Sequence, residues 1–129
     1  MAKILVVDDE PDIVRMVSKI LENQGHTVVS GGDGEAALAA VAQHQPDLVL
    51  LDLHLPKLDG FEVCRRIKAD PATRATPVIM MTAAYTSVQD AAKGLDIGAD
   101  EYVVKPFFKD ILLHNVDRLL SARAATKGS

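Results

Sequence analysis

Short apolar runs recur along the chain, and each is followed by a longer segment of mixed polarity. The runs predict β-strands at residues 4–7, 26–30, 48–51, 78–82 and 102–104, of which the second is the least apolar, as an edge strand should be. In the following segments apolar residues recur every three to four positions, as on one face of an α-helix. Repeated strand-and-helix units predict a doubly wound α/β domain, whose parallel sheet has helices on both faces because crossovers are right-handed.

Proline and glycine mark the ends of most predicted helices. Pro11 can occupy the first position of the first helix, and Gly25 is a good stop for it. The second helix is expected to end before Pro46, and Asp70–Pro71 breaks the third. The fourth helix, around residues 87–94, is poor in large apolar residues and is expected to be weak.

The last predicted helix carries its apolar residues between Ile111 and Leu120, so we expect it to end near Ser121. We assign residues 1–121 to a single domain. Residues 122–129 have no apolar face to bury, and we expect them to form a tail that is disordered or weakly helical.

Composition narrows the class of protein. The chain has 129 residues, 48% of them hydrophobic, which is enough for one sizeable core. The formal net charge is −4 and Lys and Arg form no run, so we expect no direct nucleic-acid partner. Cys64 is the single cysteine, and no apolar stretch approaches the roughly 20 residues of a membrane span. We therefore expect a cytoplasmic protein that does not associate with membranes.

Polar residues lie at the ends of four predicted strands. Ligands of an open parallel sheet bind outside the carboxyl ends of the strands, so these side chains are expected to converge on one crevice. Carboxylates, a hydroxyl and an ammonium together suit a site for a metal ion and a phosphoryl group. The residues are Asp8, Asp9, Asp52, Thr82 and Lys105.

The carboxylates point to Mg²⁺ as the metal. Crowded negative charges favour a divalent cation, and oxygen ligands without a Cys/His set favour Mg²⁺ over zinc. The backbone carbonyl of His54, shortly after Asp52, could complete the coordination shell. Asp52 could also form an aspartyl phosphate, with the Lys105 ammonium offsetting its charge and the Thr82 hydroxyl donating a hydrogen bond.

Taken one at a time, these residues have simpler explanations. A lone Asp at a strand end is more often a helix N-cap, and an isolated Lys or Thr there is usually on the surface. Tyr102 can equally be a plain strand aromatic. The joint occurrence of the acids, the hydroxyl and the ammonium at four strand ends is what favours phosphoryl chemistry.

The chain resembles the receiver domains of bacterial two-component response regulators over nearly its whole length. The resemblance rests on several motifs that together are highly specific. They are ILVVDDE at 4–10, DLVLLDL at 47–53, PKLDG at 56–60, MTA at 81–83 and GADEYVVKPF at 98–107.

The resemblance implies a flavodoxin-like fold with strand order 2-1-3-4-5. It implies that Asp52 accepts a phosphoryl group from a histidine kinase or phosphotransfer protein. Asp9 and Asp52 would be direct Mg²⁺ ligands, and Asp8 would act through water. Thr82 and Lys105 would hold the phosphoryl oxygens.

The resemblance also implies a switch. Tyr102 falls at the position of the family's switch aromatic, so Thr82 and Tyr102 would together change the face formed by the fourth helix, the fifth strand and the fifth helix. That face would control a partner or output domain that the sequence does not identify. We expect a monomer, or a dimer that depends on phosphorylation.

Two other functions fit parts of the pattern. A haloacid-dehalogenase-like phosphatase also combines an aspartyl phosphate with Mg²⁺ and Lys, but it needs a second acid two residues after the nucleophile, where this chain has His54. The second function is that of a receiver that works only as a docking scaffold, independently of phosphorylation. Loss of the acidic site residues would favour this interpretation. A P-loop nucleotide binder is excluded because the chain has no Gly-x-x-x-x-Gly-Lys-[Ser/Thr] run. We therefore expect a signalling module whose only chemistry is its own phosphorylation and dephosphorylation.

Overall fold

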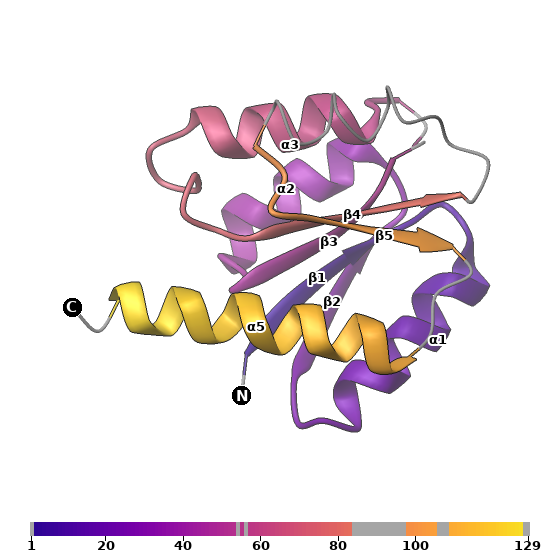
Figure 1. Ribbon diagram of the computed structural model, residues 1–129. Coiled ribbons are helices and arrows are strands. Elements are labelled where there is room, and N and C mark those ends of the chain that lie inside the picture. Colours follow the sequence, from indigo (N-terminus) through magenta and orange to yellow (C-terminus); the bar gives the residue numbers. More distant parts are fainter. Residues whose placement is uncertain (1, 54, 56, 84–97, 106–108, 128–129) are drawn as a thin grey trace.

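The computed structural model describes residues 2–53, 55, 57–83, 98–105 and 109–127. Five parallel strands form one sheet in the order β2-β1-β3-β4-β5 (Figure 1). The strands are β1 (Lys3–Val7), β2 (Thr27–Gly31), β3 (Leu48–Asp52), β4 (Val78–Ala83) and β5 (Glu101–Lys105), and the described helices are α1 (Pro11–Glu22), α2 (Gly34–His44), α3 (Gly60–Ala69) and α5 (Lys109–Lys127). The predicted fold and strand order are confirmed, whereas the predicted helix around residues 87–94 lies outside the described residues.

Helices cover both faces of the sheet and divide the core into two layers. In Figure 1, α2 and α3 lie on one face, and α1 and α5 lie on the other. Alternating residues of each strand serve the two layers, so that Leu5 packs with the α2 and α3 side chains while Ile4 packs with those of α1 and α5. All five residues of β3 are buried, as expected for the central strand, whereas the residues of the edge strand β2 are exposed or only partly buried.

Local capping fixes where the helices begin. Pro11 occupies the first turn of α1, as predicted. The carboxylate of Asp33 accepts a hydrogen bond from the Ala36 N–H at 2.8 Å and so caps α2, and Asp59 caps α3 in the same way through the Glu62 N–H at 3.0 Å.

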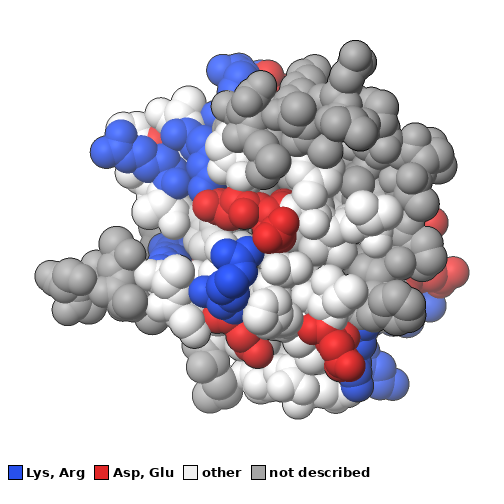
Figure 2. All heavy atoms as spheres, viewed as in Figure 1, with Lys and Arg blue, Asp and Glu red and all other residues white. Residues whose placement is uncertain are grey.

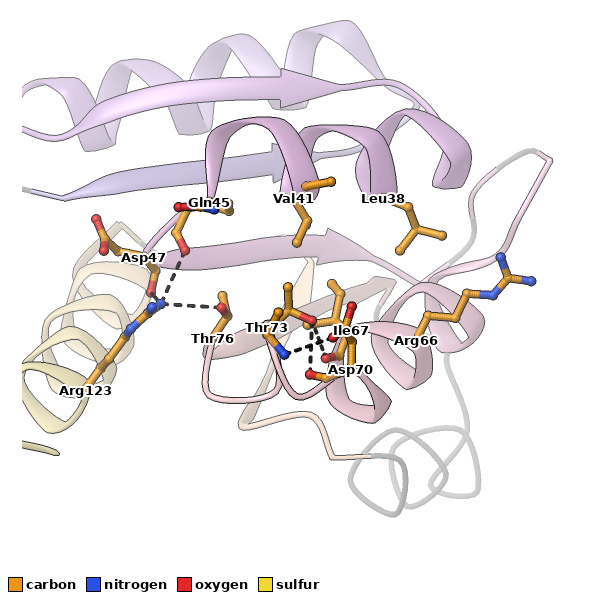
Figure 3. A pocket seen from close by; sticks show the side chains of 13 residues that line it. Leu38, Val41, Gln45, Asp47, Arg66, Ile67, Asp70, Thr73, Thr76 and Arg123 are labelled. Carbon is orange, nitrogen blue, oxygen red and sulfur yellow. Dashed lines mark hydrogen bonds between the residues drawn. The ribbon is translucent and has the colours of Figure 1, made fainter. Parts of the chain in front are cut away.

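Helix α5 does not end where the sequence pattern predicted. It continues to Lys127 instead of ending near Ser121, so the predicted helix end is wrong and residues 122–127 are helical and not disordered. Two physical reasons account for this: Ala, Arg and Lys are strong helix formers, and Arg123 is anchored by tertiary contacts. Its Nη1 donates to the carbonyl oxygens of Asp47 at 3.0 Å and Pro46 at 3.3 Å, and reaches the Thr76 hydroxyl at 3.5 Å (Figure 3).

Replacing Arg123 by alanine should destabilise the fold. The substitution keeps helix propensity high but removes the donor from two backbone carbonyls, so we expect the free energy of unfolding to fall by about 1–3 kcal/mol in urea titrations. Arg118→Ala is the control in the same helix, since Arg118 pairs with Glu101 in a surface ion pair at 2.8 Å and should contribute less than about 1 kcal/mol. Equal losses in the two variants would show that Arg123 does not anchor the helix.

Candidate functional site

The acids predicted from the sequence lie at the carboxyl edge of the sheet, on adjacent central strands. Val7 of β1 lies opposite Leu51 of β3. Asp8 and Asp52 are the residues that come directly after this pair, so they lie side by side at the ends of the two strands. The Asp8 N–H donates to the Gly31 carbonyl oxygen at 3.3 Å, which ties the end of β1 to β2. The strand register alone therefore brings the two carboxylates to one edge.

Burial separates these acids from ordinary surface carboxylates. Asp8 is 2% exposed and Asp52 is 6% exposed, and they are the buried acids in the described part of the chain. Charged side chains are rarely buried unless a partner compensates them. Asp9, by contrast, is exposed to solvent. Two buried acids on adjacent strands concentrate negative charge at this edge of the sheet, which suits a site for a cation.

The structure adds a carboxylate that the sequence analysis did not include. One carboxylate oxygen each from Asp8, Asp9 and Glu10 lies within 4.8 Å of the others. The Asp8 carboxylate also accepts the Glu10 N–H at 3.0 Å, which turns the chain into α1. The run of three consecutive acids was the sequence signal for Glu10. Oxygen donors at this spacing fit a hard divalent cation such as Mg²⁺.

Thr82 and Lys105 are placed by their backbones only. Asp52 lies opposite Met81, and Ala83, which follows Thr82, lies opposite Lys105, so these strands end at the same edge. The Thr82 and Lys105 side chains and the whole of His54 lie outside the described residues. Their convergence on Asp52 stays a prediction.

The chain around Asp52 is held from both sides. After β3, the Leu53 N–H donates to the Met81 carbonyl oxygen at 2.9 Å, and the Gly60 N–H donates to the Leu53 carbonyl oxygen at 3.0 Å. A side chain at Gly60 would overlap the Asp52 carbonyl oxygen, so this close approach needs glycine. The loop that follows Asp52 therefore closes back on the end of β3.

Tyr102 lies on β5, opposite Met80 of β4. It is partly buried and packs against the core layer of α2 and α3. Its backbone N–H donates to the Glu101 carboxylate at 2.9 Å. The structure places this aromatic ring at the rim of the core, and its role as a switch stays a prediction.

Cavity size does not identify the site. A cavity of about 600 Å³ lies between α2 and α3, lined by Val41, Ile67, Thr73 and Arg123 among others (Figure 3). Its lining includes Asp47, which precedes β3, so it lies at the amino ends of the strands, away from the acids. A smaller cavity of about 400 Å³ is lined by Asp8 and Asp9. The chemistry, and not the volume, points to the carboxyl edge.

The single cysteine takes no part in this chemistry. Cys64 lies fully buried in the core layer of α2 and α3. Burial raises the pKa of the Cys64 thiol to about 11, so very little thiolate is present at neutral pH.

The model of the response regulator receiver domain family matches residues 4–117. The chain belongs to this family. Members are the receiver domains of two-component response regulators, signalling domains for which phosphorylation and Mg²⁺ binding at an acidic cluster are general features. They are generally not classical enzymes, and the haloacid-dehalogenase-like alternative finds no support.

Curated relatives and solved structures agree with this assignment. The chain is 46% identical over 120 residues to the DNA-binding dual master transcriptional regulator RpaA of Synechocystis sp., covering 93% of this chain and 49% of that protein. It is 47% identical over 105 residues to the DNA-binding response regulator MtrA of Mycolicibacterium smegmatis, covering 81% and 44%. The chain thus spans about half the length of these relatives.

Two solved receiver domains share the fold. The receiver domain of Francisella response regulator 1452 superposes with a TM-score of 0.86 at 30% identity, covering 95% of this chain and 98% of that one. The receiver domain of a signal transduction histidine kinase from Syntrophus aciditrophicus gives 0.88 at 33% identity, covering 95% and 92%.

These relatives contradict the expectation of no direct nucleic-acid partner. RpaA and MtrA are both named as DNA-binding proteins. The net charge of −4 belongs to 129 residues, about half the length of such proteins. It does not predict whether the rest of those proteins binds DNA. On the face seen in Figure 2 acidic and basic side chains are interspersed. The receiver itself pairs Arg118 of α5 with Glu101 of β5.

None of the described helices combines the length and the apolar character needed to cross a bilayer.

Proposed function

We propose that this receiver is a phosphorylation-controlled switch in which Asp52 accepts a phosphoryl group from a histidine kinase or phosphotransfer protein. The observation that carries the proposal is the burial of Asp52 at the end of the central strand, beside the equally buried Asp8. Family membership supplies the reaction class. The single buried thiol and the signalling role favour the cytoplasm as its compartment.

In the proposed reaction a carboxylate oxygen of Asp52 attacks the phosphorus. The new O–P bond forms as the bond between phosphorus and the donor's leaving group breaks, and the leaving group takes that bond's electron pair. The Lys105 ammonium offsets charge on the phosphoryl oxygens, and the Thr82 hydroxyl donates a hydrogen bond to one of them. The domain performs this chemistry on itself and does not turn over a separate substrate.

Mg²⁺ is the proposed cofactor. Asp9 and Asp52 would bind it directly, the His54 backbone carbonyl would complete the protein ligands, and Asp8 would act through water. Glu10 adds a further negative charge to the acidic cluster. When bound, the ion neutralises charge on the transferring phosphoryl group.

In the proposed switch, phosphorylation changes the surface that the domain presents to its partners. A phosphoryl group held by Thr82 would draw its hydroxyl inward, and Tyr102 would turn into the space that this leaves, which shifts the population of two states. The face that includes β5 and α5 would then change partners. Because relatives of about twice this length are named as DNA-binding, we propose that such a face controls a DNA-binding output domain, through a monomer or a phosphorylation-dependent dimer.

Incubation with acetyl phosphate and Mg²⁺ should add one base-labile phosphoryl group per chain, measured by intact mass spectrometry. Beryllofluoride, as a phosphoryl mimic, should slow amide exchange in residues 87–94 and in β5. No mass increase would refute the phosphoacceptor function. Uptake of the group with exchange changes confined to α2 would refute the proposed switch face.

A further inference from the structure

The loop that follows Asp52 is seated on the first turn of α2. Gly34, the first residue of α2, lies against Leu58 of this loop. A Cβ atom at Gly34 would overlap the Leu58 carbonyl oxygen and come within 2.6 Å of the Leu58 Cβ. The Gly34 backbone is not in the left-handed region. This position therefore needs glycine only because Leu58 comes so close to it.

An ion pair forms a second contact between the same two segments. The Lys57 Nζ lies 3.6 Å from the Asp33 carboxylate, whose other oxygen accepts the Ala36 N–H at 2.8 Å. The Ala36 N–H and the Lys57 ammonium lower the pKa of Asp33, against the opposing effect of burial, so this carboxylate is charged at neutral pH. Asp33 therefore both caps α2 and, through Lys57, holds the loop.

The loop adopts a conformation that its own sequence does not favour. Lys57 has a φ of 68°, in the left-handed region that only glycine adopts readily. Such a conformation persists only where surrounding contacts over-determine it. Near Lys57 and Leu58, the contacts with Asp33 and Gly34 hold the loop in this conformation. At Gly60, the loop packs against the carbonyl oxygen of Asp52.

We propose that Gly34 and the Asp33–Lys57 pair are positioning residues for the phosphoacceptor site, which set its affinity for Mg²⁺ by holding the loop after Asp52. This inference rests on the proposed function, because it assumes that Asp52 binds the ion. Groups that orient metal ligands without touching the metal typically change its affinity by about 10–100-fold when they are replaced.

The test compares glycines two residues apart. Gly34→Ala should raise the dissociation constant of Mg²⁺ by about tenfold, measured by calorimetry on the unphosphorylated protein. It should also speed amide exchange in residues 57–60 without metal. Gly32→Ala is the matched control, since a Cβ there meets nothing within 4 Å, and it should change neither quantity. Urea unfolding establishes that both variants are folded during the titration.

A second substitution decides the matter even if Gly34→Ala fails to fold. Lys57 is 60% exposed, so Lys57→Gln should fold. A purely electrostatic role predicts tighter Mg²⁺ binding, because a positive charge near the acids is lost. A positioning role predicts weaker binding, by about threefold, and recovery in Lys57→Arg.

The outcomes separate this inference from the proposed function. Wild-type protein that binds no Mg²⁺ and takes up no phosphoryl group would refute the proposed function. Normal binding by wild type together with unchanged binding in folded Gly34→Ala, or tighter binding in Lys57→Gln, would overturn the positioning role alone.

Discussion

Asp52→Asn should abolish phosphorylation by acetyl phosphate, with a loss in rate of at least about 1,000-fold. The amide has nearly the shape of the carboxylate but is a far weaker nucleophile. Since Asp52 is 6% exposed and lies beside another buried acid, loss of its charge should not destabilise the fold. Intact mass spectrometry over a time course measures the rate, and urea unfolding establishes that the variant is folded.

Asp59→Asn is the matched control for this experiment. Asp59 lies in the same loop and caps α3 through the Glu62 N–H, and asparagine caps a helix as well as aspartate does. The control should be phosphorylated at the wild-type rate. A base-labile phosphoryl group that forms on Asp52→Asn as fast as on wild type would assign the acceptor to another residue.

Removal of Mg²⁺ should have an effect of similar size. In excess EDTA we expect no detectable phosphorylation, because the crowded acids repel an incoming phosphoryl group unless a cation is present. Asp9→Ala should weaken Mg²⁺ binding by about 100-fold, and Asp8→Ala by less, since Asp9 is the proposed direct ligand and Asp8 acts through water. Calorimetric titration of the unphosphorylated variants measures both affinities.

The control for the acidic cluster is Asp12→Ala. Asp12 is an exposed acid in the first turn of α1 and pairs with Arg15 at 3.1 Å. Its loss changes the net charge by the same amount as loss of Asp9, and it should leave Mg²⁺ affinity nearly unchanged. If phosphorylation continues undiminished in EDTA, the metal has no part in the reaction.

The sequence by itself determined the sheet, most of the helix ends and the location of the acids. Apolar runs and helical spacing are local signals, and a parallel sheet with right-handed crossovers then leaves few topologies open. Asp8 and Asp52 could be assigned to one edge because each directly follows a strand, and the carboxyl ends of parallel strands meet there. The order of the strands came from the family's motifs and not from periodicity.

Tertiary structure decided what depends on contacts between distant segments. The end of α5 depends on Arg123 reaching carbonyls at Pro46 and Asp47, far away in the chain, so the absence of a local apolar face was misleading. The need for glycine at Gly34 arises only because Leu58 approaches it in the fold. No local pattern encodes such contacts, because they exist only once the helices and loops have packed on the sheet.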